Sequence, residues 1–298
     1  MKSNRHFPVA VVPRQFWFCL AAWTFALSSP GQGAAPDKSH YTLFNPVPVT
    51  AMRELNTDRP DKTESPYTVD AGHFQFEMDL VSFTDDRHNS AGDDTHIQSW
   101  SVAPVNLKAG LCNRVDFQLI LQPHNRVRTS SARGGTVQSQ SGFGDVTTRL
   151  KLNCWGNDGG PTALGLIPYV KWPAAQDELG NGAVEGGLIV PLALKLPGGW
   201  SLGLMAQCDF TRDSAGSGYH PEFIHSATFG HGIVGKLEGY AEFFSAVSTE
   251  RDSEWIGTAD FGLTYGLTAN VQLDAGVAIG VTRAADDLTL FLGASFRF

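Results

Sequence analysis

Residues Leu288 to Phe298 read LTLFLGASFRF, and counting back from the last of them every second side chain is apolar. The apolar positions are Phe298, Phe296, Ala294, Leu292, Leu290 and Leu288. The other parity carries Arg297, Ser295, Gly293 and Thr289. Successive side chains of a strand point to opposite faces, so this pattern predicts a β-strand with one apolar and one polar face.

The same alternation, bounded by clusters of Gly, Pro, Asn and Asp, recurs along the chain and predicts about twelve strands. We therefore predict an all-β fold, a transmembrane antiparallel up-and-down β-barrel that covers residues 72–298. The expected strands are His73–Phe83, His96–Leu111, Arg114–Gln122, Gly144–Trp155, Thr162–Trp172, Ala183–Lys195, Trp200–Thr211, Glu222–Gly230, Lys236–Val247, Trp255–Tyr265, Asn270–Val281 and Leu288–Phe298.

The connections between these strands alternate in length. Long ones, such as Thr84–Thr95 and Pro123–Gly142, follow every second strand, and short ones, such as the turn at Cys112, follow the others. Short periplasmic turns and long outer loops are typical of bacterial outer-membrane barrels. A soluble antiparallel sandwich shares the alternation within strands, but it explains neither the connections nor the aromatic end of the chain. That end resembles the assembly signal of outer-membrane barrels, and we expect this role for Phe296 and Phe298.

The first 35 residues predict export. Three basic residues, Lys2, Arg5 and Arg14, precede an apolar run that is followed by small residues up to Ala35. This order is typical of a secretory signal peptide, here residues 1–35, because a run of about a dozen residues is shorter than the roughly 20 that a membrane helix needs. Its removal leaves 19 basic and 30 acidic residues, a net charge of −11, which argues against a nucleic-acid partner. We expect the mature protein in the bacterial outer membrane.

If the apolar face of each strand meets lipid, the opposite face lines the lumen, where charges cost little. Both signs of charge occur on that face, so these side chains either line a pore or pair with one another and fill the barrel. Twelve strands tilted by about 40° give a backbone diameter of about 24 Å, of which side chains leave about 10 Å. The predicted lumen-lining residues are Glu77, Asp79, Lys108, Arg114, Asp116, Arg149, Lys151, Lys171, Glu185, Tyr240, Glu242, Asp260, Asp274 and Arg297.

Residues 36–71 precede the first strand, carry several prolines and show little alternation. They contain a charge-dense run that begins with Thr57, Asp58, Arg59, Pro60 and Asp61. We predict an extended periplasmic segment. It can fold into the lumen as a plug and pair Arg59 with interior carboxylates, or it can stay a solvated linker.

Three stretches carry a resemblance to a known family. They are TDRPDKTESPYTVDAGHFQFE (57–77), SGFGDVTTRLKLNCWGNDGG (141–160) and IPYVKWP (167–173), and with the closing strand they extend over nearly all of the mature chain. They resemble the outer-membrane transporters labelled "putative MetA-pathway of phenol degradation". This resemblance implies an outer-membrane β-barrel that passes small, often aromatic, compounds, and it implies no set of binding residues.

We therefore predict a passive channel for small solutes, aromatic or otherwise apolar, with outer-membrane lipid and the barrel assembly machinery as partners. We expect no enzyme activity, cofactor or metal, because no histidine has the spacing of a zinc helix and no serine that of a nucleophile elbow. Two alternatives stay open. One is a barrel enzyme, a hydrolase, with Ser226 beside His225 or His231, and the other is a structural or adhesion barrel with a filled lumen.

Two smaller features also leave alternatives open. The first long loop carries two histidines and two aspartates that either catch a cation or are solvated, namely His88, His96, Asp93 and Asp94. Cys112 and Cys154 end neighbouring strands at the periplasmic rim, where oxidising conditions permit a disulfide. Their parities differ, which argues against that bridge.

Overall fold

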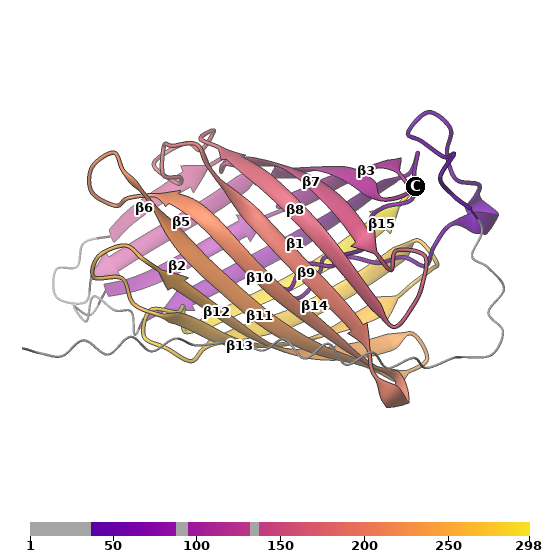
Figure 1. Cartoon of the computed structure of the whole chain (residues 1–298). Coiled ribbons are helices and arrows are strands. Elements are labelled where there is room, and N and C mark those ends of the chain that lie inside the picture. The colour runs from indigo at the N-terminus through magenta and orange to yellow at the C-terminus, as the bar shows by residue number, and fades with distance from the viewer. Residues whose placement is uncertain (1–36, 88–94, 132–136) are drawn as a thin grey trace, which may run out of the picture. The chain divides into compact units, whose positions relative to one another are not determined.

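The computed structural model describes residues 37–87, 95–131 and 137–298. Twelve of the described strands form a closed antiparallel barrel, in which β15 pairs with β1 (Figure 1). These strands are β1 (Phe74–Asp86), β3 (Val105–Cys112), β4 (Val115–Leu121), β7 (Val146–Trp155), β8 (Thr162–Trp172), β9 (Glu185–Lys195), β10 (Trp200–Arg212), β11 (Tyr219–Val234), β12 (Leu237–Ser248), β13 (Ile256–Gly266), β14 (Val271–Gly280) and β15 (Leu288–Arg297). The predicted twelve-stranded β-barrel is confirmed.

Helices contribute little to the described residues. Two short 3₁₀ turns occur, η1 (Val49–Ala51) and η2 (Pro197–Gly199). Within the described ranges, no helix has both the length and the apolar character needed to cross a membrane.

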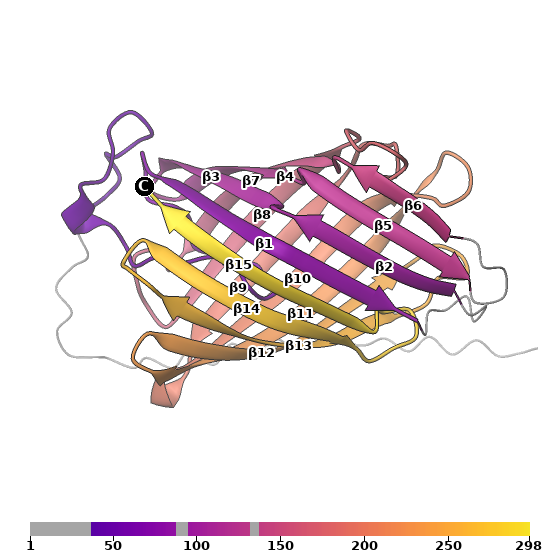
Figure 2. The ribbon, with the colours of Figure 1, turned by 180° about the vertical axis from the view of Figure 1, so that it is seen from behind.

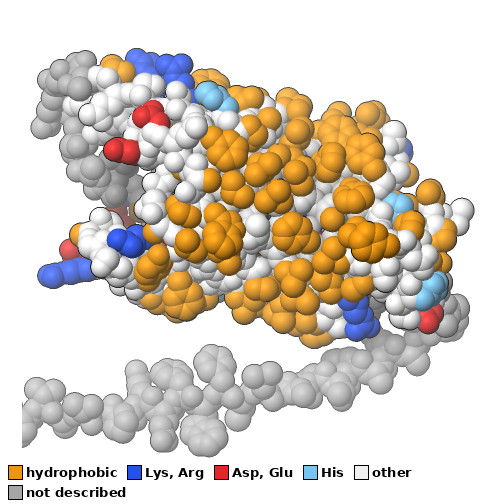
Figure 3. All heavy atoms as spheres, turned by 90° about the horizontal axis from the view of Figure 1, so that it is seen from above, with side chains coloured by type: hydrophobic (Ala, Val, Ile, Leu, Met, Phe, Trp, Pro, Cys, Tyr) orange, Lys and Arg blue, Asp and Glu red, His pale blue; other side chains and the backbone are white. Residues whose placement is uncertain are grey.

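The outer wall is apolar because the strands alternate as predicted. In β14, for example, Leu273 and Ile279 are exposed on the outside, whereas Asp274 is buried inside. Hydrophobic side chains form a broad band over the barrel surface in Figure 3. Exposed aromatic residues lie toward both ends of the strands, with Trp155, Trp200 and Tyr265 near the short turns and Trp172, Tyr219 and Trp255 near the long connections. Two such aromatic girdles mark the membrane interfaces of outer-membrane barrels, whose short turns face the periplasm.

Three more strands continue the wall at the long-loop end, β2 (Thr95–Val102), β5 (His124–Ser131) and β6 (Val137–Gly142) (Figure 2). β2 pairs with β1 and β5, and β5 pairs with β6. The prediction of a loop over Pro123–Gly142 is therefore wrong. The sequences of β5 and β6, HNRVRTSS and VQSQSG, lack the apolar face on which the prediction depended.

The predicted strand His96–Leu111 is divided into β2 and β3. The break lies at Ala103, which has a positive φ of 56°, and at Pro104, which has no N–H to donate to the sheet. β1 bulges between Asp79 and Val81, and the Asp79 N–H donates to the Pro104 carbonyl at 3.1 Å. As a result, β1 pairs with β3 through its first half and with β2 through its second half.

Residues 37–55 lie at the barrel end that also carries the carboxy-terminus (Figures 1 and 2). Backbone hydrogen bonds hold them there, because the Leu43 N–H donates to the Leu111 carbonyl at 2.8 Å and the Val47 N–H to the Ala71 carbonyl at 3.0 Å. The chain then runs through the barrel interior before it enters β1.

Candidate functional site

Residues 56–67, here called the luminal segment, are ion-paired to the inner wall of the barrel. Asp58 binds two lysines at once, because its Oδ2 lies 2.5 Å from Lys108 Nζ on β3 and its Oδ1 lies 2.5 Å from Lys151 Nζ on β7. Its backbone N–H donates to Glu77 Oε2 at 3.0 Å, and Lys108 also pairs with Glu77. All four side chains are buried. Charges held this way depend on one another, because an unpaired buried charge costs about 3 to 5 kcal/mol.

Arg59 binds the wall at the place where the sheet closes. Its Nη2 lies 2.7 Å from Asp79 Oδ1 on β1 and 2.7 Å from Asp274 Oδ1 on β14. These aspartates flank Gly293 on β15, which is in register with both. A Cβ atom on Gly293 would lie 2.0 Å from Arg59 Nη2. The guanidinium therefore occupies the space that a larger residue at position 293 would fill.

The middle of the luminal segment contacts the wall across β11 to β13. Lys62 Nζ lies 3.2 Å from Asp260 Oδ2. The Thr63 hydroxyl donates to Glu242 Oε1 at 2.5 Å and lies 2.6 Å from Ser226 Oγ. The segment thus contacts strands from both halves of the barrel.

Most of the predicted lumen residues contact this segment or the residues that flank it. These are Glu77, Asp79, Lys108, Asp116, Arg149, Lys151, Glu242, Asp260, Asp274 and Arg297. Lys171 and Glu185 pair with each other, and Tyr240 lines a cavity beside Asp61. Arg114 is different, because it is exposed in the turn before β4. It has the luminal parity but lies just outside the strand, so its lumen-lining role stays a prediction.

Beyond the luminal segment the inner wall becomes apolar. Five consecutive strands, β8 to β12, contribute Ile167, Ile189, Met205, Ile224 and Ala246 to one buried cluster, against which Tyr169, Phe244 and Ile256 pack. We call these eight residues the apolar patch. The alternation rule missed it, because that rule assigns apolar side chains to the lipid. The sequence does carry a signal for this patch, because strands such as β9 have apolar residues on both faces and not on the lipid-facing one alone.

The apolar patch and the luminal segment touch. Lys62 Nζ lies 4.7 Å from the centre of the Phe244 ring, a cation–π contact. The backbone N–H of Glu64 lies 3.5 Å from Met205 Sδ, while the Glu64 carboxylate pairs with Arg149. A solute on the patch would therefore lie directly against the segment.

A cavity of about 840 Å³ lies at the long-loop end, and it shares Ala246 and Ile256 with the apolar patch. This volume is within the range of small-molecule sites. Apart from Ala284, its remaining lining is polar and carries several acidic side chains. One of them, Glu250, accepts hydrogen bonds from the side chain and backbone of Ser214, and these bonds lower the pKa of its carboxyl group. The lumen thus offers a charged mouth, an apolar patch and an ion-paired segment beneath them.

Residues 57–298 match the sequence profile of the family described as "Putative MetA-pathway of phenol degradation". The chain belongs to this family. No curated protein sequence matches it.

Solved structures similar to this MetA-pathway family member are bacterial outer-membrane barrels. The COG4313 outer membrane channel from Pseudomonas putida F1 is 15% identical with a TM-score of 0.60, over 82% of this chain and all of that one. The NanC porin is 10% identical with a TM-score of 0.48, over 74% of this chain and 98% of that one. At this identity the likeness to the COG4313 channel supports the fold.

The structure also shows where the residues of the suggested hydrolase pair and of the suggested disulfide lie in this family member. His225 and Ser226 are neighbours on β11 and point to opposite faces, with His225 exposed and Ser226 buried in the lumen. His231 lies against the Trp200 ring. The proposed hydrolase pair is therefore not assembled among these residues. Cys112 and Cys154 are both free, so the disulfide that the sequence left open is not formed, in line with their opposite parities.

The cation site suggested for the first long loop is only partly described. His96 lies 2.7 Å from Asp85. The other members of that group, His88, Asp93 and Asp94, lie outside the described residues.

Proposed function

We propose that this outer-membrane barrel is a passive channel for small apolar solutes, aromatic compounds foremost, in which the apolar patch binds the solute and the luminal segment acts as a plug. The observation that carries the proposal is the patch. Its eight apolar or aromatic residues meet inside a barrel whose other interior positions are largely charged. The family description, with its reference to phenol degradation, supports the same class of solute.

The patch favours apolar solutes by a useful but modest amount. Apolar surface removed from water contributes roughly 25 cal/mol per Å², so an aromatic ring that buries about 100 Å² gains roughly 2.5 kcal/mol. A sugar finds few hydrogen-bond partners on the patch and gains little. Binding of this strength suits a channel, because a solute has to enter and also leave.

We infer that residues 1–35, which lie outside the described ranges, direct export, and that residues 36–71 form a periplasmic segment whose luminal part plugs the barrel. Outer-membrane lipid would contact the apolar band, and the assembly machinery would recognise the strand that ends at Phe296 and Phe298. We infer no catalytic role.

Block of ionic current in planar bilayers tests the solute class. Refolded protein should carry a small current that phenol or toluene reduces and that glucose at the same concentration leaves unchanged. Met205→Gln keeps the side-chain volume but makes the patch polar, so it should weaken the aromatic block several-fold. Leu204→Met, on the lipid-facing side of the same strand, is the matched control and should leave the block unchanged. Equal block by glucose and phenol would instead indicate a general porin.

A structural barrel with a filled lumen is the second candidate, and the ion-paired luminal segment favours it. The two functions differ in what happens when the segment is removed. A channel without its plug carries more current than the intact protein. A barrel that carries no current before or after removal is structural.

A further inference from the structure

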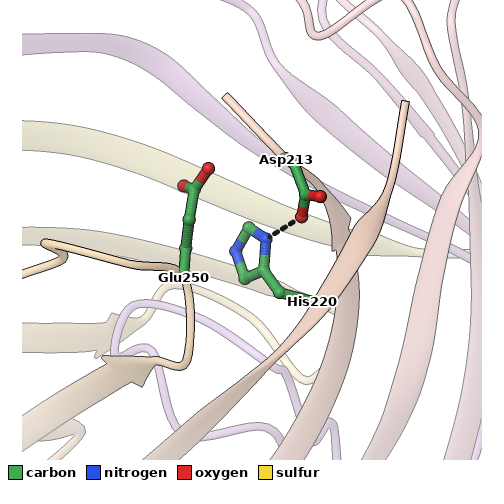
Figure 4. Close-up of side chains that lie close together, drawn as sticks. All are labelled: Asp213, His220 and Glu250. Carbon is green, nitrogen blue, oxygen red and sulfur yellow. Dashed lines mark hydrogen bonds and ion pairs between the residues drawn. The ribbon is translucent and has the colours of Figure 1, made fainter. Parts of the chain in front are cut away.

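Three potential metal ligands converge at the mouth of the barrel, and the channel function does not use them. Asp213 lies in the connection between β10 and β11, His220 near the start of β11, and Glu250 in the connection between β12 and β13. His220 Nδ1 lies 2.9 Å from Asp213 Oδ1, and one ligand atom from each of the three side chains lies within 4.8 Å of the others. Figure 4 shows the Glu250 and Asp213 side chains on either side of the imidazole.

The backbone brings these three residues together. The Asp213 N–H donates to the Gly218 carbonyl at 3.1 Å, which closes the first connection next to His220. The Thr249 N–H donates to the Pro221 carbonyl at 3.1 Å, and the Thr249 hydroxyl donates to the same carbonyl at 2.9 Å. Glu250 is thereby held beside the first residues of β11. Two separate connections therefore supply one set of ligands.

The charges around the cluster favour a cation. Arg212, the arginine of the cavity lining, is directed elsewhere, because its Nη2 donates to the Gly216 carbonyl at 3.0 Å and its guanidinium lies over the Tyr219 ring. Within the described part of the chain, His220 is the one basic partner recorded for the Asp213 carboxylate, and Glu250 accepts hydrogen bonds from Ser214.

We propose that Asp213, His220 and Glu250 bind one divalent transition-metal ion, with Zn²⁺ the best fit, and that water completes its coordination. One imidazole nitrogen with two carboxylates suits Zn²⁺, whereas Ca²⁺ and Mg²⁺ prefer oxygen ligands alone. Tetrahedral ligands at 2.0 to 2.1 Å from zinc lie roughly 3.3 Å apart. The three ligand atoms lie within 4.8 Å of one another, so no pair has to close by more than about 1.5 Å. Asp213 is 30% exposed, so its side chain has room for that movement.

The bound ion would join the two connections at the edge of the mouth cavity. It would bind one unprotonated nitrogen of His220, because an imidazole binds metal only through such a nitrogen.

Zinc titration of the untagged, metal-stripped barrel in detergent, with a chromogenic chelator as competitor, tests the site. We expect one Zn²⁺ per chain in a site that Ca²⁺ does not compete for, and Co²⁺ should give the visible absorption of a tetrahedral N/O complex. Asp213→Asn and Glu250→Gln should each weaken binding at least tenfold. Heat-modifiable migration on gels verifies that both variants are folded.

The matched control is Asp85→Asn. Asp85 lies 2.7 Å from His96, and its other oxygen pairs with Arg87, so this is a second carboxylate–imidazole pair that lies outside the proposed site. Its substitution should leave zinc binding unchanged. Binding that survives Asp213→Asn, or that Ca²⁺ displaces as readily as Zn²⁺, overturns the proposal.

Discussion

At Gly293 the inner wall has no side chain, and the guanidinium of Arg59 occupies the space between Asp79 and Asp274. Gly293→Val should therefore expel Arg59 from the wall and leave the two carboxylates unpaired. Valine suits a strand, so the barrel itself should persist. We expect a higher single-channel conductance. We also expect the free energy of unfolding to fall by up to about 3 to 5 kcal/mol, and by less where water in the lumen solvates the two carboxylates.

Gly232→Val is the matched control for that substitution. Gly232 also lies in a strand, and a Cβ atom there meets nothing within 4 Å. Its conductance should equal that of the wild type. If Gly293→Val also conducts like the wild type while urea unfolding shows no destabilisation, Arg59 does not hold the segment as described.

Single residues also show how far the sequence predicts the site. Alternation placed Asp79 and Asp274 on the luminal face, and the charged run identified Arg59 as a partner for interior carboxylates. The sequence did not identify Asp79 and Asp274 as the partners of Arg59, because the distance between these two aspartates depends on the register of β15 with β1 and β14. Met205 and Ile224 were missed for a different reason, since an apolar side chain on a barrel strand is expected to face lipid.

At the scale of elements, β5 and β6 form a hairpin that the twelve-stranded barrel does not need. Its base is already closed, because the Gly144 N–H donates to the Gln122 carbonyl at 2.9 Å. Replacing residues 124–142 with a two-residue Asn-Gly turn should therefore leave β4 and β7 paired, since that turn suits a hairpin. We expect unchanged heat-modifiable migration and an unchanged melting temperature within a few degrees.

Excision of a barrel hairpin is the contrasting case. Removing residues 162–195, which include β8 and β9, takes two strands out of the closed wall and should abolish folding. Equal damage from both deletions would show that β5 and β6 belong to the folding core.

The sequence predicted the barrel strands well because lipid demands an apolar face on each, and it missed β5 and β6 because their sequences carry no such face.

At the scale of the whole molecule, the luminal segment obstructs a narrow interior. Removing residues 36–66 behind an intact signal peptide should give a barrel with the same strand content and a several-fold larger conductance, because a lumen of about 10 Å is sensitive to any inserted chain. Arg59→Ala should act in the same direction but more weakly. Equal conductance of the deletion and the intact protein would contradict a plug.

A crosslink separates a mobile plug from a fixed one. Thr63 Oγ1 and Ser226 Oγ lie 2.6 Å apart, so Thr63→Cys with Ser226→Cys should form a disulfide in a background without the native cysteines. If solutes pass only when the segment moves, oxidation should abolish their uptake and reduction should restore it. Thr63→Cys alone is the control and should be insensitive to redox conditions.

The position of Arg59 also has a consequence for the order of events during assembly. β15 pairs with both β1 and β14, and Arg59 reaches across it from Asp79 to Asp274. The binding site of Arg59 is complete only after β15 has paired with both β1 and β14. The luminal segment leaves the ribosome before any strand of the barrel does, yet its partners are complete only when every strand is in place. A segment that is made before the barrel strands therefore reaches its final position after them, and its binding requires that the barrel is closed.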